Sequence, residues 1–182
     1  MKIVETSFPE VKIFEPAVFG DDRGFFMESW NDRTFAAHGV AAQFVQDNHS
    51  RSARGVLRGL HYQIASPQGK LVRVVNGAVF DVIVDIRRSS ANFGRWDGVL
   101  LSAENKRMLW VPPGFAHGFL SLRDDTDFLY KCTQFWSSSD ERSLLWSDPA
   151  LAIDWPLGEI GSPLVSAKDA VAPTLANAEV YP

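Results

Sequence analysis

The chain has 182 residues, of which 46% are hydrophobic and 22% are charged, and its formal net charge is −4. These values are ordinary for a globular protein and predict one domain, residues 1–182, with a sizeable core. The acidic balance gives no support to nonspecific nucleic-acid binding, which depends on a basic surface. No apolar run is long enough to cross a bilayer, and the single cysteine excludes an internal disulfide. We therefore expect a soluble cytoplasmic protein with no nucleic-acid or membrane partner.

The first fifty residues predict short strands and one helix. Two prolines interrupt the loosely alternating residues 1–20, which is typical of edge strands. The segment Gly20–Phe26, GDDRGFF, predicts a turn that leads into a strand. A helix is expected over Asp32–His38, because Asn31 is a suitable N-cap for it. A further strand is expected over Phe44–Asn48.

Cations interrupt the apolar pattern of the next segment, Arg54–Lys70, which reads RGVLRGLHYQIASPQGK. Its apolar residues predict a buried strand, yet Arg58, His61 and Lys70 lie among them. Burying an unpaired charge is costly, so these cations need either internal carboxylates or a bound anion. The local pattern leaves both possibilities open.

Residues 71–86 show the clearest strand signal of the chain. The runs LVRVV and AVFDVIVDI are joined by Asn76-Gly77, which predicts a β-hairpin. The second run has apolar residues on both faces, which predicts a strand covered on both sides. Turn residues separate further β-rich runs at 96–101, 107–111, 116–122 and 128–136. This spacing predicts an all-β sandwich or barrel, around which the tail from Asp148 would wrap with one or two helical turns.

The histidines could serve either as metal ligands or as a general base. A metal site would need several converging ligands, but the chain has no His-x-His pair and one cysteine, so we expect no metal. A general base needs only one histidine that a carboxylate orients. His61 is the best candidate because it lies among cations. Asp169 could orient it, although its local sequence alone favours a solvated loop or a helix cap.

Other polar and aromatic residues could either bind a ligand or have a purely structural role. Arg23, Arg58 and Lys70 could form an anion clamp, because guanidinium groups fit phosphate oxygens; ordinary surface ion pairing is the alternative. Tyr130 and Trp136 could serve a ligand or simply be strand aromatics. The chain has neither a glycine-rich phosphate loop nor a Gly-x-Ser-x-Gly elbow.

Several motifs taken together resemble the dTDP-4-dehydrorhamnose 3,5-epimerase family. In chain order they are DRGFFMES, QDNHS, RGVLRGLHYQ, QGKLVRVVNGAVFDVIVDIRR, FGRW, WVPPGFAHGFL, FLYK, DPALAIDWP and SAKDA, from about Asp22 to Pro173. Each motif is weak by itself, but the ordered set is specific. The resemblance implies an all-β, cupin-like jelly-roll fold with a few short helices, a homodimer, and a cofactor-independent isomerase.

The resemblance also implies roles for individual residues. His61 matches the catalytic base, and Asp169 matches the carboxylate that orients it. Tyr130 matches the acid on the opposite face, and Lys70 matches the cation beside the keto oxygen. Trp136 falls where the family stacks a ring on thymine. The positions that hold the nucleotide-sugar are matched by Arg23, Glu28, Gln46, Asn48, Arg58, His117, Glu141 and Lys168.

The implied reaction is epimerisation of dTDP-4-dehydro-6-deoxy-D-glucose at carbons 3 and 5, which gives dTDP-4-dehydro-L-rhamnose for dTDP-L-rhamnose and cell-envelope polysaccharide synthesis. The 4-keto group acidifies both flanking carbons, and proton removal and return involve no redox step, so no nicotinamide cofactor is expected. Three alternatives remain open: a single-carbon epimerase, a noncatalytic sugar-nucleotide-binding module, and a metal-dependent cupin.

Overall fold

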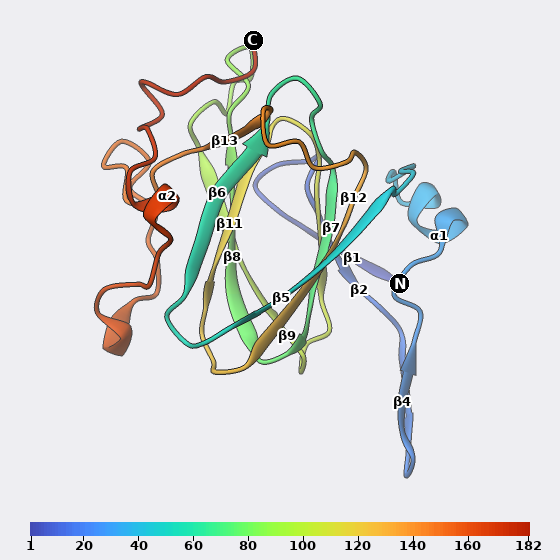
Figure 1. Ribbon diagram of the computed structural model, residues 1–182. Coiled ribbons are helices and arrows are strands. Elements are labelled where there is room, and N and C mark those ends of the chain that lie inside the picture. The colour runs from blue at the N-terminus through green and yellow to red at the C-terminus, as the bar shows by residue number, and fades with distance from the viewer.

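The computed structural model describes residues 1–182 and consists mainly of antiparallel strands in two facing sheets (Figure 1). The six-stranded sheet has the order β1 (Lys2–Glu5), β2 (Lys12–Glu15), β10 (Met108–Val111), β7 (Lys70–Asn76), β12 (Thr126–Cys132) and β5 (Gln46–Ser52). The five-stranded sheet has the order β13 (Glu141–Ser143), β6 (Leu57–Gln63), β11 (Phe115–Ser121), β8 (Ala78–Asp85) and β9 (Trp96–Ser102). The predicted all-β sandwich is confirmed.

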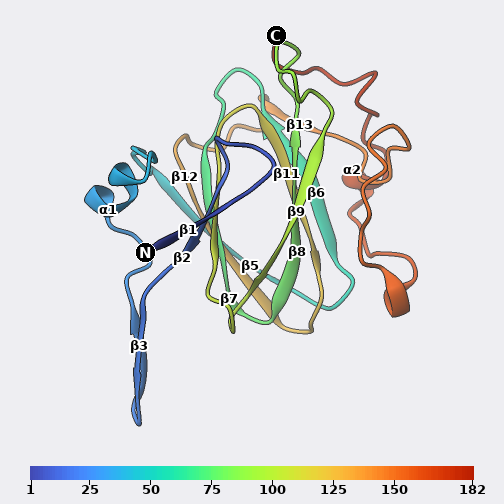
Figure 2. The same ribbon diagram turned by 180° about the vertical axis from the view of Figure 1, so that it is seen from behind.

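Strand β8 is buried on both faces, as its sequence predicts. Val79 and Ile83 belong to the apolar cluster between the two sheets. Val82 and Val84 belong to a second cluster on the outer face of the five-stranded sheet, where they meet apolar side chains of the C-terminal tail. This tail contains the short helices η1 (Gly158–Ile160) and α2 (Ala167–Ala170) and runs along that face (Figure 2).

The predicted hairpin at Asn76-Gly77 is wrong. Strands β7 and β8 are consecutive in the chain but lie in different sheets: β7 pairs with β10 and β12, whereas β8 pairs with β11 and β9. Gly77 still makes a sharp bend, with φ of +78°, and passes so close to Thr126 that an added Cβ would lie 2.3 Å from its hydroxyl oxygen. The dipeptide therefore fixes a local bend, while pairing with strands distant in the sequence places β7 and β8 in different sheets.

Helix α1 (Asp32–Ala37) forms where the sequence predicts it and ends one residue earlier than expected. The side-chain oxygen of Asn31 accepts the backbone N–H groups of Arg33 and Thr34, which caps the helix. Phe35 packs against Phe14, so the helix covers part of the outer face of the six-stranded sheet.

Strands β3 (Val18–Asp21) and β4 (Gly24–Met27) form a hairpin that projects from the body of the molecule (Figures 1 and 2). The predicted turn followed by a strand is confirmed here. Phe19, Phe25 and Phe26 are 62–70% exposed on this hairpin, which is unusual for three large apolar side chains in one small element.

The C-terminal tail is tied to strand β6 by two tyrosines. The Tyr62 hydroxyl donates to the Glu179 carbonyl oxygen, and the Tyr181 hydroxyl donates to the Gln63 carbonyl oxygen. Burial raises the pKa of each phenol to about 12, because removal from water disfavours the phenolate. None of the helices is both long and apolar enough to cross a membrane.

Candidate active site

A cavity of about 490 Å³ lies between the two sheets, beside the α2 segment. This volume suits a small organic ligand. Its walls come from β5, β7 and β12 of one sheet, β6 and β11 of the other, and the tail. The polar side chains that line it belong to Ser50, Arg58, His61, Lys70, His117, Tyr130, Ser166, Lys168 and Asp169. A smaller adjoining pocket shares His61, Lys70 and Tyr130 with it, and its other polar or aromatic lining residues include Gln46, Asn48, Gln63, Gln68, Trp136 and Glu141. No three His, Cys, Asp or Glu side chains gather as metal ligands.

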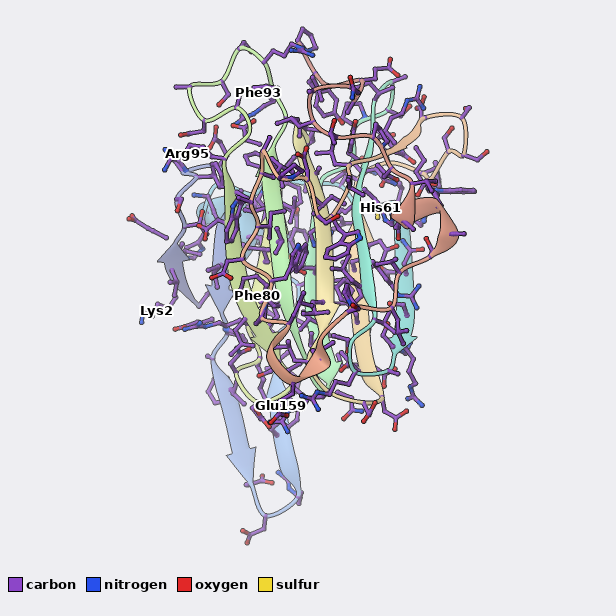
Figure 3. The ribbon with its side chains drawn as sticks, turned by 90° about the vertical axis from the view of Figure 1, so that its left-hand side faces the viewer. Lys2, His61, Phe80, Phe93, Arg95 and Glu159 are labelled. Carbon is purple, nitrogen blue, oxygen red and sulfur yellow. The ribbon has the colours of Figure 1, made fainter.

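His61 and Asp169 are 108 residues apart in the chain but form a hydrogen bond of 2.7 Å between Nε2 and Oδ1. Figure 3 shows His61 on β6, next to the tail segment that carries α2. The Ser166 hydroxyl accepts the backbone N–H of Asp169 and caps this short helix, which fixes the carboxylate. Asp169 is 3% exposed, so the solvated-loop interpretation of this residue is wrong.

The hydrogen-bond partners of Asp169 favour the ionised form of its carboxyl group. Burial by itself would raise the pKa of this carboxyl, but the hydrogen bond and charge of His61 outweigh it and hold the pKa below its usual range. A carboxylate can only accept, so the Nε2 of His61 carries the shared proton. In the neutral ring, Nδ1 is then the basic nitrogen.

Lys70 and Tyr130 lie on the neighbouring strands β7 and β12, and both line the cavity with His61. Burial lowers the pKa of the Lys70 ammonium, against the attraction of Cys132, Glu141 and Asp81. Burial also raises the pKa of the Tyr130 phenol. The cavity therefore brings together the imidazole of His61, the protonated phenol of Tyr130 and the half-buried side chain of Lys70.

Sequence reasoning missed one carboxylate, Asp81. It is completely buried, and its oxygens lie 2.8 and 3.0 Å from Nε2 of His117. His117 on β11 is the register partner of His61 on β6, and both histidines line the cavity, while Asp81 lies behind His117. Burial raises the pKa of Asp81, against the opposing effects of His117 and Lys70. The available signal was an acidic residue between Phe80 and Val82 in the apolar part of the strand, although Asp85 gives the same signal at the strand's end.

The mouth of the cavity is built from hydrogen-bonded polar side chains. Gln46 accepts the backbone N–H of Trp136 at 2.8 Å and donates to Asn48 at 3.0 Å. Lys168 and Glu141 form an ion pair at 2.5 Å. These predicted substrate residues therefore lie together, as do Arg58 and His117 in the main cavity.

Arg23 and Glu28 are the two predicted site residues that the fold keeps away from this cavity. Arg23 lies at the turn of the projecting β3–β4 hairpin, where it pairs with Asp21. Glu28 accepts a hydrogen bond from Asn31 at the start of α1. Within one chain, the predicted clamp of Arg23, Arg58 and Lys70 is therefore not assembled.

The model of the dTDP-4-dehydrorhamnose 3,5-epimerase family matches residues 5–177. The chain belongs to this family. It is 58% identical over 183 residues to the dTDP-4-dehydrorhamnose 3,5-epimerase of Pseudomonas aeruginosa, with 100% of both chains covered. The fold is the cupin-like jelly roll of these epimerases, and the chain is an isomerase of this class.

Two solved structures of similar proteins are a double epimerase and a single-carbon epimerase. A dTDP-6-deoxy-D-glucose-3,5-epimerase from Legionella pneumophila, in complex with dTDP-4-keto-L-rhamnose, has a TM-score of 0.93 at 53% identity, and the match covers 97% of this chain and 93% of that one. A 3'-monoepimerase from Streptomyces bikiniensis, in complex with dTDP-quinovose, has a TM-score of 0.88 at 37% identity over 94% and 86% of the two chains.

Proposed function

We propose that this epimerase inverts carbons 3 and 5 of dTDP-4-dehydro-6-deoxy-D-glucose within the cavity beside α2, and that His61, Asp169, Tyr130 and Lys70 carry the chemistry. The observation that carries these roles is the His61–Asp169 hydrogen bond in a cavity that Lys70 and Tyr130 also line. A base, an acid and a cation are the three groups that proton removal, proton return and an enolate require.

In the proposed mechanism, the neutral ring of His61 takes the proton from the carbon next to the keto group. Asp169 holds the ring in place and stabilises the imidazolium that forms. The electron pair of the broken C–H bond forms the C=C bond of an enolate, the π pair of the carbonyl moves onto the keto oxygen, and the Lys70 ammonium stabilises the negative charge there. Tyr130 then donates a proton to the opposite face of the carbon, which inverts it.

The diphosphate and the thymine of the substrate would be held by different groups of side chains along the cavity and its mouth. Arg58 is free to bind phosphate oxygens, because its contacts are a side-chain hydrogen bond of 3.1 Å to Ser52 and one of 3.3 Å to a backbone carbonyl. Lys168 is next to Asp169 in sequence, lines the cavity and pairs with Glu141 at its mouth. Trp136 is 54% exposed at this mouth and offers an indole face on which thymine can stack.

Single-carbon epimerisation is the second candidate, because the 3'-monoepimerase of Streptomyces bikiniensis has the same fold at 37% identity. Proton NMR of the product separates the two. A double epimerase gives a ring whose coupling constants report inverted configuration at both carbons flanking the ketone. Inversion at one carbon would replace the proposal with the single-carbon reaction, and an unchanged sugar would leave only a binding role.

We further propose that the enzyme acts as a homodimer in which the β3–β4 hairpin completes the partner's site. The exposed apolar rings of this hairpin support the proposal, since they would be covered by a second copy. Arg23 lies on the same hairpin, too far from its own cavity to serve it, and would reach the diphosphate of the neighbouring subunit.

A complementation experiment tests this arrangement. Arg23→Ala and His61→Ala variants, each inactive as homodimers, are unfolded together and refolded as a mixture. Random pairing should restore about a quarter of the wild-type activity, because half of the dimers then contain one intact site of two. No recovery, in a mixture shown by ultracentrifugation to contain dimers, would place Arg23 in its own subunit's site or outside any site.

Residues 1–182 are proposed to act as one domain, because the cavity takes its side chains from both sheets and from the tail. We also propose a cytoplasmic location. The free thiol of Cys132 supports it, because such thiols persist in reducing compartments.

A further inference from the structure

Two glutamines hold the backbone of the loop that carries Trp136. The carbonyl oxygen of Phe135 accepts from Gln63 Nε2 at 3.2 Å, and the N–H of Ser137 donates to Gln63 Oε1 at 2.7 Å. Between them, the N–H of Trp136 donates to Gln46 Oε1 at 2.8 Å. Backbone groups of three consecutive residues are thus bound by side chains from opposite sheets, since Gln63 belongs to β6 and Gln46 to β5.

The amide of Gln63 is buried and fully hydrogen-bonded. It is 2% exposed, and its amide makes three hydrogen bonds, the third from Nε2 to the Ser66 carbonyl oxygen at 2.9 Å. The donor and acceptor ends are fixed, because Phe135 offers a carbonyl and Ser137 an N–H. Gln63 is also two residues from His61 on the same strand, so the base and the loop share one rigid support.

The ring of Trp136 needs this support because its own packing is weak. Its side chain is 54% exposed, and its neighbour Phe135 is 67% exposed. The direction of the indole is therefore determined mainly by the backbone from which it projects. A partner that holds the carbonyl before Trp136 and the N–H after it fixes that backbone on both sides.

We propose that Gln63 is a positioning residue for nucleobase binding: it acts through the loop backbone to hold the Trp136 ring over the base of the bound nucleotide. This inference rests on the proposed function, in which Trp136 stacks on thymine. It assigns a role to a residue whose amide is hydrogen-bonded to the loop backbone on both sides of Trp136. Loss of the Gln63 amide should weaken nucleotide binding while the chemical step proceeds at its usual rate.

The matched control is Gln68. Its amide donates to the Gln134 carbonyl oxygen of the same loop at 2.8 Å, but this bond is exposed and lies two residues from the indole. Gln63→Met and Gln68→Met therefore remove the same functional group from the same loop. Only Gln63→Met removes a buried amide, the one that is hydrogen-bonded to the residues before and after Trp136.

The test measures dTDP binding by calorimetry and steady-state kinetics for Gln63→Met, Gln68→Met, Trp136→Ala and the Gln63→Met/Trp136→Ala double variant. Gln63→Met should raise the Kd for dTDP and the KM roughly tenfold, as expected for lost buried hydrogen bonds. Its kcat should stay within about threefold of the wild type. Gln68→Met removes an exposed amide from the wall of the same pocket and should raise Kd and KM by a clearly smaller factor than Gln63→Met does. The double variant should bind no more weakly than Trp136→Ala alone, because Gln63 acts through that ring.

Additive losses in the double variant, or a Gln63→Met enzyme with unchanged dTDP affinity, would overturn the inference. Gln63→Glu provides a second variant should Gln63→Met fail to fold, since it keeps the acceptor for Ser137 and loses both donors; it should show the same KM effect. If the wild type itself does not bind dTDP, the proposed function fails instead. If Trp136→Ala binds dTDP normally, the stacking role of Trp136 fails.

Discussion

The hydrogen bond between His61 and Asp169 makes a quantitative prediction for Asp169→Asn. The asparagine oxygen can still accept the Nε2 proton of His61 at about the same place, so the ring keeps its orientation. The carboxylate charge that stabilises the imidazolium is lost. Asp169 is almost fully buried and 2.7 Å from the ring nitrogen, so solvent screens little of this effect.

The size of the effect follows from two limits. Replacing a charge-assisted hydrogen bond by a neutral one costs about 1–2 kcal/mol. The full attraction between unit charges about 4 Å apart is about 4 kcal/mol at an effective dielectric constant near 20. These limits correspond to a loss of about 10-fold to 10³-fold in kcat.

The assay is steady-state epimerisation of the 4-keto sugar nucleotide, with Asp148→Asn as the control. Asp148 is another buried carboxylate, but it accepts the backbone N–H groups of Ala150 and Leu175 outside the cavity. The control should lower the melting temperature and leave kcat within about twofold of the wild type at temperatures where it is folded. An Asp169→Asn enzyme with wild-type kcat would refute the role given to this pair.

Three further predictions concern buried and paired groups. Asp81→Ala leaves His117 without its buried partner. It should lower the free energy of unfolding, measured by urea denaturation, by about 3 kcal/mol. A change below about 0.5 kcal/mol would show that the buried pair does not stabilise the fold. All three tyrosines have a raised pKa, so absorbance at 295 nm should show little tyrosinate in the native enzyme at about pH 10, where exposed phenols are half ionised. Arg51 and His49 hold the pKa of Asp127 at about 2, so this carboxylate stabilises the fold above pH ~4 and loses that effect as the pH falls towards 2. The stability difference between the wild type and Asp127→Asn should therefore shrink over this interval, and a constant difference would contradict it.

Local sequence signals predicted the elements whose determinants are local. The Asn31 cap gave helix α1, and apolar residues on both faces of residues 78–86 gave a strand covered by both the core and the tail. The Asn76-Gly77 signal failed because strand pairing is decided by distant partners. It predicted a bend correctly, but that bend carries the chain from one sheet to the other.

The active site could not be predicted from local sequence patterns, because its contacts join residues that are far apart in the chain. Asp169 meets His61 only because the tail returns along the five-stranded sheet, and its local sequence favoured a solvated position. Family resemblance supplied that pairing in advance. It did not indicate Asp81, whose role depends on the β8–β11 register, nor the position of Arg23 on a hairpin that projects away from the cavity.

The central claim, proton transfer at two carbons by His61 and Tyr130, is tested most directly by proton NMR of the 4-keto sugar nucleotide in deuterated water. The wild type should replace the protons on carbons 3 and 5 with deuterium as both centres invert. His61→Ala should bind the substrate and exchange neither proton, while Tyr130→Phe should exchange protons without productive inversion. Normal exchange at both carbons by His61→Ala would contradict the claim.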